Sequence, residues 1–358
     1  MPQKNSQSAC FGRLRSFLLQ EALTCCATSS EIQFSQTYFG LVMGTVAQNC
    51  WIATALFDAC PDDTDVATAV QTCANHVVQH ARPEGWTYFN NCPDIPPDTD
   101  DLALAMSLLR CAQWPRLERL LSGPLRLLRE NTASPGAFRT WLCQDGQPMA
   151  LDERWVSHIA PVQPDVVANI AWALLSGGHH EWELDIKSAI HWLSADPVAR
   201  LSENHWYYGD GYIGFIMMRL FCDCPSEWYE RKQADVAAQT LAESLRSGQL
   251  SDGSWPHGNA PIARRTLARN DVKGNARSCL ETAWRVAALR EIERAEDLDA
   301  IRSAQRFLVR RQMADGAYAA EPFFETVSPQ PYGSRGITSA AVLRALSPAK
   351  RQKLCAAP

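Results

Sequence analysis

The heptapeptide Gln249-Leu-Ser-Asp-Gly253-Ser-Trp255 closes an amphipathic segment of the chain, and Gln312-Met-Ala-Asp-Gly316-Ala-Tyr318 closes another in the same form. Each consists of Gln, three residues, Gly, one residue and an aromatic, with weaker echoes at residues 83–86 and 135–138. Glycine tolerates the left-handed turn that ends a helix, and the aromatic residue can then pack on the neighbouring hairpin. The pattern predicts repeated helical units and carries no chemistry of its own.

Helical periodicity runs along almost the whole chain, and strand-like alternation is sustained nowhere. Six segments rich in apolar residues are expected to be buried on all sides: residues 48–59, 101–112, 165–176, 211–222, 276–289 and 336–346. Between them lie amphipathic, more charged segments: residues 66–80, 116–130, 184–195, 226–245 and 298–311. This alternation favours stacked helical hairpins. We predict an all-α fold, an (α/α)6 toroid of alternating inner and outer helices around one cavity, with residues 1–35 as an N-terminal helical extension and residues 36–358 as the toroid domain.

The composition is that of a globular protein with a large core, with 46% hydrophobic and 20% charged residues and a net charge of −5. An acidic chain without basic runs offers no surface for phosphate backbones, so we do not expect a nucleic-acid partner. The thirteen cysteines are odd in number and include no CxxC spacing, which argues against a disulfide framework and against a zinc site. We expect reduced thiols in a cytoplasmic protein.

No segment approaches the length of a transmembrane helix. The apolar stretch at residues 17–26 contains Gln20 and Glu21, which argues against a signal peptide. We expect a soluble protein and leave transient contact with a membrane surface open, because a lipid-like substrate has to be collected from somewhere.

Three acidic residues stand in the run Asp98-Thr-Asp100-Asp101, directly before the apolar stretch 102–109. Packed carboxylates raise the pKa of one member, so that a proton can remain on the cluster at neutral pH, while the helix N-terminus stabilises the ionised members. The run is therefore a candidate Brønsted acid that faces an apolar space. Ordinary helix capping is the alternative, and we interpret the similar run at residues 62–65 as capping only.

The Gln–aromatic repeat is similar to that of the prenyltransferase and squalene-cyclase superfamily, and Asp98-Thr-Asp100-Asp101 resembles the DxDD motif of class II terpene cyclases. In size the chain resembles the short, single-domain class II cyclases that act on prenylated aromatic acids in meroterpenoid pathways. The resemblance spans roughly residues 40–350, and only the aspartate run is chemically specific.

This resemblance implies that Asp100 is the catalytic acid, which protonates a terminal alkene or an epoxide, and that Asp98 and Asp101 tune it. The chain is too short for a second toroid, and it has no clear acidic magnesium motif for a diphosphate. The nearest such run, at residues 296–299, is interpreted as a helix cap. We expect a linear polyprenyl substrate with a head group other than a diphosphate, and no metal or other cofactor.

The chemistry of such a reaction agrees with the residues. Aromatic faces stabilise a carbocation without offering a nucleophile, and the richest aromatic cluster precedes an inner helix. We predict that this cluster lines the substrate cavity: Trp206, Tyr207, Tyr208 and Tyr212, with Phe215 one turn further along the chain. For any single aromatic residue, packing is the alternative.

Polar residues near other helix starts complete the predicted site. Asn169, about one turn into the helix expected beside Asp100, is a candidate for tuning the acid or deprotonating the final cation. Tyr332 and Arg335 stand together before the last inner helix, and Arg335 could receive a carboxylate or phenol head group. Structural hydrogen bonding is the alternative for Asn169, and a solvent contact for Arg335.

Other classes of protein remain open. Toroids also serve glycosidases and polysaccharide lyases, but these glycosidases use two separated carboxylates, whereas the aspartates here are clustered. A protein prenyltransferase subunit would need zinc ligands in register, and no Cys-x-His sequence follows Cys279. A non-catalytic repeat scaffold predicts instead that Asp100 is dispensable and that no aromatic-lined cavity exists.

Overall fold

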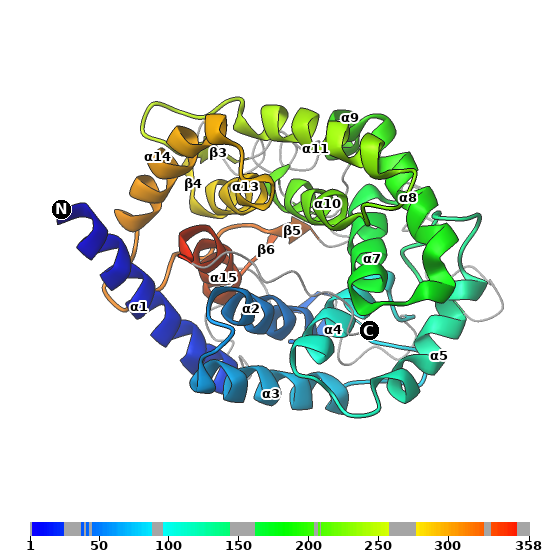
Figure 1. Cartoon of the computed structure of the whole chain (residues 1–358). Helices are drawn as coiled ribbons and strands as arrows, with labels where there is room; N and C mark the ends of the chain where they lie inside the picture. Colours follow the sequence, from blue (N-terminus) through cyan, green and yellow to red (C-terminus); the bar gives the residue numbers. More distant parts are fainter. Residues whose placement is uncertain are drawn as a thin grey trace.

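The structure, a computed structural model, describes residues 2–24, 37–38, 41–42, 45–87, 96–143, 162–203, 207, 209–257, 277–325 and 331–348. Helices of the described residues lie in two concentric layers (Figure 1). The inner layer is formed by α2 (Val46–Ala59), α4 (Thr99–Cys111), α7 (Pro164–Gly177), α10 (Gly211–Asp223), α13 (Cys279–Ile292) and α15 (Arg335–Leu346). Each of these helices contacts the next one, and α15 contacts α2, so the inner ring closes.

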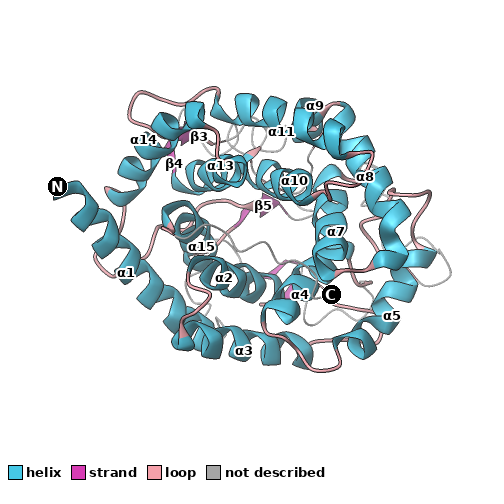
Figure 2. Cartoon of the chain, in the orientation of Figure 1, coloured by secondary structure: helices cyan, strands magenta, loops and turns pink. Residues whose placement is uncertain are grey.

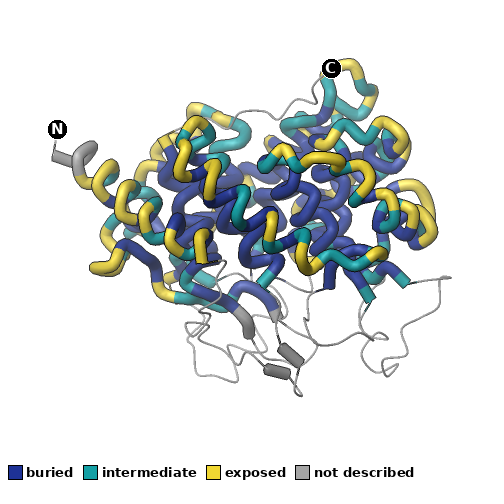
Figure 3. Tube along the Cα trace, turned by 90° about the horizontal axis from the view of Figure 1, so that it is seen from below, coloured by how far each residue is buried: buried dark blue, intermediate teal, exposed yellow. Residues whose placement is uncertain are grey.

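The outer layer packs around this ring with its polar face to solvent. It consists of α1 (Pro2–Leu23), α3 (Thr64–Gln79), α5 (Leu117–Glu130), α8 (Glu183–Ala195), the short α9 (Pro197–Ser202), α11 (Arg231–Arg246) and α14 (Leu298–Val309). Figure 3 shows the consequence, with a buried centre and exposed turns along the outer helices. In the described part of the chain, no helix has the length and apolar content needed to span a membrane.

The strands of the described residues form three two-residue antiparallel pairs (Figure 2). They pair β1 (Thr37–Tyr38) with β2 (Leu41–Val42), β3 (Trp255–Pro256) with β4 (Arg277–Ser278), and β5 (Phe324–Glu325) with β6 (Pro331–Tyr332). The predicted helical fold is therefore confirmed at the level of a mostly helical chain.

Two predicted helix starts were wrong, each for a local reason. The helix predicted from residue 276 begins at Cys279, because residues 277–278 pair with β3 and Ser278 caps the helix by accepting a hydrogen bond from the Glu281 amide at 2.9 Å. The helix predicted from residue 226 begins at Arg231, because backbone hydrogen bonds from Trp228 to Pro225 and from Arg231 to Trp228 form turns there.

The two heptapeptides tie one outer helix to the next. The Gln249 side-chain amide donates to the Gly253 carbonyl at 3.0 Å and to the Ala300 carbonyl of α14 at 2.9 Å. Gln312 repeats this arrangement, donating to the Gly316 carbonyl and to the Cys10 carbonyl of α1, both at 2.8 Å. Helix α1 thus follows α14 in the outer layer, and it also contacts α2, α3 and α15.

We expect Gly253→Ala to lower the free energy of unfolding by about 3 kcal/mol, because a left-handed backbone conformation and a steric overlap both destabilise the alanine variant. Gly253 has φ +93°, and a Cβ there would overlap the Ser303 carbonyl. Gly248 is the matched control, since its φ is +74° but a Cβ would meet nothing within 4 Å. Gly248→Ala should cost only about 1 kcal/mol. Urea unfolding of both variants measures the difference, and equal losses would contradict the role assigned to the close approach.

Candidate active site

The aspartate run is fixed at the start of α4 by backbone and side-chain contacts. Asp98 is the N-cap, and its Oδ1 accepts from the Asp101 amide at 2.7 Å. Thr99 is held from both sides, since its amide donates to the Thr140 carbonyl at 2.8 Å and its hydroxyl to the Arg139 carbonyl at 2.6 Å. Asp98 and Asp101 are consequently 6% and 3% exposed, whereas Asp100 is only half-buried. Of the three carboxyls, Asp100 is the one that a bound molecule can reach.

Asp100 receives hydrogen bonds from two other segments. The Tyr207 hydroxyl donates to its Oδ2 at 2.6 Å, and the Asn169 side-chain amide of α7 donates to its Oδ1 at 2.8 Å. The Asn169 amide also lies 3.1 Å from the Tyr212 hydroxyl, which accepts from the Trp51 indole N–H at 3.3 Å. The N-terminal halves of α2, α4, α7 and α10 therefore meet at one polar chain that ends on Asp100.

Aromatic rings surround this chain. The centroids of Tyr207 and Tyr212 are 4.4 Å apart, and Phe323 lies 4.9 Å from Trp51 and 5.1 Å from Tyr207. Trp284 packs against both Tyr212 and Phe215 at 5.1 Å. Such ring faces attract positive charge and offer no strong nucleophile.

Burial governs the protonation of the aspartate run. It raises the pKa of Asp98 well above its usual range, and the neighbouring charge of Asp101 adds to the effect. Burial also raises the pKa of Asp101 to about 7, although a hydrogen bond with Asp98 opposes the shift. The pKa of Asp100 is raised by burial and held back by the hydrogen bonds from Tyr207 and Asn169. A proton can therefore remain on this cluster at neutral pH.

Asp165, in the first turn of α7, extends the acidic cluster. It is 1% exposed, and neither carboxyl oxygen has a side-chain hydrogen-bond partner among the described residues. Burial, followed by the charge of Asp100, raises the pKa of Asp165 to about 8. No arginine, lysine or histidine in the described part of the chain forms an ion pair with any of the four carboxyls. Without a basic partner, the buried carboxyls favour their neutral, protonated form over the ionised form.

The other aspartate run behaves differently, as predicted. Asp63 is the N-cap of α3, and its side chain accepts from the Asp65 and Val66 amides at 3.0 and 3.3 Å. It also pairs with Arg15. Although partial burial opposes them, these partners lower the pKa of Asp63. The capping interpretation is confirmed for this run.

A small pocket lies among the inner helices. Asn169 and Tyr212, both linked to Asp100, line one part of it. Its apolar walls include Trp51, Trp172, Phe215 and Trp284. The polar chain that ends on Asp100 thus borders an aromatic-walled space.

The structure brings together most of the predicted site residues that it describes. Tyr207, Tyr212, Phe215 and Asn169 all lie in this region, whereas Trp206 and Tyr208 lie outside the described residues. Tyr332 is described only as part of β6. Arg335 pairs with Asp315, and its guanidinium lies 5.2 Å from the ring centroid of Phe17 in α1. Arg335 therefore contacts the outer layer.

Sequence reasoning missed Asp165 and the role of Trp51 as a donor to Tyr212. A signal for Asp165 was present, because it stands four residues before Asn169 and therefore on the same helix face.

Residues 296–299 open a helix as predicted, but the predicted side-chain cap is not formed. Asp297 makes no side-chain cap but pairs with Arg246 and Arg294, both at 2.9 Å. No group of three or more potential metal ligands occurs within the described ranges.

Comparison with solved structures defines the class of fold, which is that of the type II terpene cyclases. A variant of the type II terpene cyclase MstE from Scytonema, in complex with its substrate geranylgeranyl dihydroxybenzoate, superposes with a TM-score of 0.71 over 97% of this chain and 98% of that chain, at 14% identity. Another MstE variant, in complex with its product merosterolic acid A, gives 0.67 over 96% and 97%, also at 14% identity. The predicted resemblance to single-domain class II cyclases is confirmed in structure.

Two further matches delimit what this fold implies. The ent-copalyl diphosphate synthase from Streptomyces platensis gives a TM-score of 0.60 at 16% identity, over 85% of this chain and 50% of that chain. A polysaccharide lyase gives 0.54 at 10% identity, over 93% and 96%. No family model and no curated protein matches the sequence. The shared fold thus hosts different reactions, and function has to be argued from the site.

Proposed function

We propose that this chain is a class II terpene cyclase that protonates the terminal alkene or epoxide of a linear polyprenyl substrate and cyclises it through carbocations to a polycyclic meroterpenoid. One observation carries the proposal. Asp100, half-buried and hydrogen-bonded by Tyr207 and Asn169, belongs to a buried acidic cluster without a basic partner among the described residues, beside a wall of aromatic rings.

The proposed mechanism assigns roles to the predicted site residues. Asp100 donates the proton, while Asp98 and Asp101 keep the cluster protonated by their mutual repulsion and burial. Tyr207, Tyr212 and Phe215, with Trp206 and Tyr208, stabilise the cations that follow. The walls fold the flexible chain into the reactive shape, which is largely an entropic task. In this proposal Tyr332 contacts the head group, whereas Arg335, which pairs with Asp315, is no longer assigned to it.

The proposal includes the architecture and the substrate class. We interpret the two layers as an (α/α)6 toroid of QW-like repeats, in which the predicted N-terminal extension, residues 1–35, supplies the outer helix α1 and residues 36–358 form the predicted catalytic domain. The substrate is a prenylated aromatic acid, a class that includes the geranylgeranyl dihydroxybenzoate bound by MstE. No cofactor takes part, and the proposed setting is the cytoplasm, with transient contact at a membrane surface.

Incubation of the purified protein with three polyenes tests the proposal. Geranylgeranyl dihydroxybenzoate should be converted to isomers of unchanged mass, while squalene and geranylgeranyl diphosphate should be poorer substrates. Mass spectrometry with chromatographic separation detects the cyclised isomers. A protein that leaves all three unchanged would instead support a non-catalytic scaffold.

A lyase remains the second candidate because of the structural match at a TM-score of 0.54. A polysaccharide lyase acts on a large, hydrated chain, which needs an accessible groove. The acidic cluster here is buried among aromatic side chains instead. Release of unsaturated oligosaccharides from uronic-acid polymers would favour the lyase over the cyclase.

Tyr207→Phe should slow cyclisation about tenfold by weakening the acid. The lost hydrogen bond favours the ionised form, so its removal raises the pKa of Asp100 further. A higher pKa keeps Asp100 protonated to higher pH, which shifts the alkaline limb of the kcat profile upward. The pH dependence of kcat for variant and wild type measures both effects. Identical profiles would remove Tyr207 from the tuning of Asp100.

A further inference from the structure

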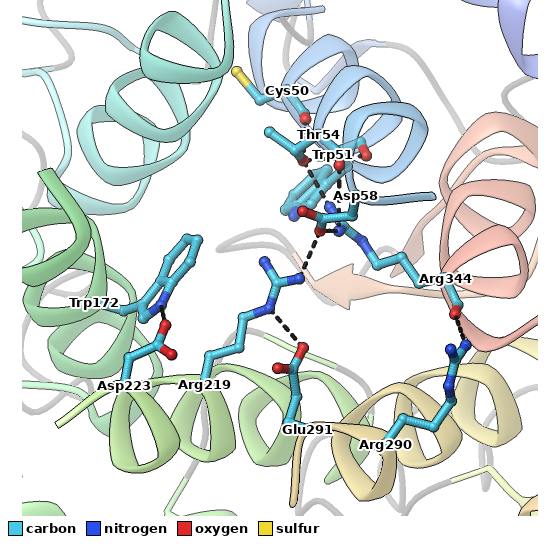
Figure 4. A network of polar contacts seen from close by, with 10 residues as sticks. All are labelled: Cys50, Trp51, Thr54, Asp58, Trp172, Arg219, Asp223, Arg290, Glu291 and Arg344. Atoms are coloured by element: carbon cyan, nitrogen blue, oxygen red, sulfur yellow. Dashed lines mark hydrogen bonds and ion pairs between the residues drawn. The ribbon is translucent and has the colours of Figure 1, made fainter. Parts of the chain in front are cut away.

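A second polar cluster lies at the C-terminal ends of the inner helices (Figure 4). Asp58 of α2 is its centre, since its Oδ2 accepts from Arg219 of α10 at 2.6 Å and also from Arg344 of α15. Arg219 donates in addition to Glu291 of α13 at 3.0 Å. Arg344 donates to the Thr54 hydroxyl at 2.7 Å. Carboxylates and guanidiniums balance here, whereas the acids at the other helix ends form no ion pair with any residue that the structure describes.

This cluster borders the pocket that is also lined by Asn169, a hydrogen-bond donor to Asp100. Asp58, Arg219 and Arg344 line the pocket together with Asn169 and Tyr212, which lead to Asp100. Asp58 is the one carboxylate among the described residues that line it. Its side chain is 12% exposed, so a proton on it can exchange with solvent. The pocket thus extends from Asn169 and Tyr212, which belong to the hydrogen-bonded chain that ends on Asp100, to the side chain of Asp58 near the ends of the inner helices.

Proton-initiated cyclisation needs such a group. The reaction gains a proton at its start, so an isomerisation has to lose one at its end. A carbocation is so strong an acid that a carboxylate held by two guanidiniums is basic enough to deprotonate it. The same guanidiniums keep Asp58 ionised between turnovers. Because Asp58 lies away from Asp100, it cannot deprotonate the first carbocations. It acts only after the positive charge has moved along the pocket.

We infer that Asp58 is the base that ends the reaction, an assignment that rests on the proposed cyclase function. The C–H bond next to the last cationic carbon breaks, its electron pair forms the new C=C bond, and the proton passes to Asp58. Exchange with water then returns Asp58 to the carboxylate and reloads Asp100. Arg219 and Arg344 are positioning residues that hold the carboxylate toward the pocket.

Asp58→Asn tests this assignment, with Asp223→Asn as the matched control. Asp223 accepts from the Trp172 indole N–H at 3.0 Å in the same cluster and does not line the pocket. We expect Asp58→Asn to reduce the fraction of the wild-type alkene about tenfold or more, with hydrated products or other alkene isomers in its place. The control should retain the wild-type product. Unchanged products from Asp58→Asn would overturn the assignment.

Asp58→Asn alone would leave Arg344 without its carboxylate partner and destabilise the fold, so a charge-balanced variant serves as a second test. Asp58→Asn combined with Arg344→Met removes the base and one guanidinium together, while Arg219 keeps Glu291. In D2O, this variant should still incorporate deuterium at the protonated carbon, which shows that initiation is intact, and should still lose the wild-type alkene. The wild-type product from this variant would also overturn the assignment. No cyclised product from the wild-type protein would mean that the proposed function itself fails, and the assignment with it.

Discussion

Asp100→Asn is expected to reduce cyclisation by about 10²–10⁴-fold, the range typical of a lost general acid. The asparagine side chain has the same size as that of aspartate and can still accept the hydrogen bonds from the Tyr207 hydroxyl and the Asn169 amide. It has no acidic proton to donate. Substrate binding should persist, because the aromatic walls are unchanged. Steady-state kinetics should therefore show a loss in kcat with little change in KM.

Asp63→Asn is the matched control for Asp100→Asn. Asp63 occupies a similar aspartate run at the start of a helix, but it caps α3 and pairs with Arg15 on the outer layer. Its substitution should leave kcat unchanged. Equal turnover by Asp100→Asn and the wild type would remove Asp100 from the mechanism.

Asp165→Asn is expected to stabilise the protein at alkaline pH and to flatten its pH dependence. Asp165 has a folded-state pKa of about 8, against roughly 3.9 in the unfolded chain. Between these values the folded state binds the extra proton, so the free energy of unfolding falls as pH rises. The loss per group is on the order of 1 kcal/mol per pH unit. The asparagine side chain cannot ionise, so the variant does not lose stability in this way as the pH rises.

Urea unfolding at pH 5, 6, 7 and 8 measures the effect as the difference between variant and wild type. The difference matters because other groups titrate in the same range. Burial lowers the pKa of His76 to about 4, which contributes with the opposite sign, and Asp101 contributes with the same sign as Asp165. The difference should grow in favour of Asp165→Asn as pH rises. Parallel curves for the two proteins would show that Asp165 does not hold a proton in the folded state.

Helices of the inner layer were predictable because they are apolar on every side. The predicted ranges 211–222 and 336–346 agree with α10 and α15 within one residue at each end. The starts of α11 and α13 were not predictable, because turns and a short strand pair, rather than periodicity, decide where these helices begin.

The acidic site was predictable only where residues are adjacent in sequence. Asp98, Asp100 and Asp101 form one run, and the apolar helix after them indicated burial. Asp165 and Asp58 are isolated acids in helical segments. Only the closure of the inner ring places Asp58 in the wall of the pocket and brings Asp165 under the influence of the charge of Asp100. The same closure decides that Arg335 contacts Asp315 and Phe17 of the outer layer.

Deuterium incorporation tests the central claim most directly, that a proton held by Asp100 starts the reaction. The protein, equilibrated in D2O, is incubated with geranylgeranyl dihydroxybenzoate, and the product is analysed by mass spectrometry and carbon NMR. We predict one non-exchangeable deuterium per product molecule, located in the methylene of the first ring that was the terminal =CH– carbon, next to the carbon that carries the two methyl groups. A cyclised product without deuterium at that carbon would contradict the account.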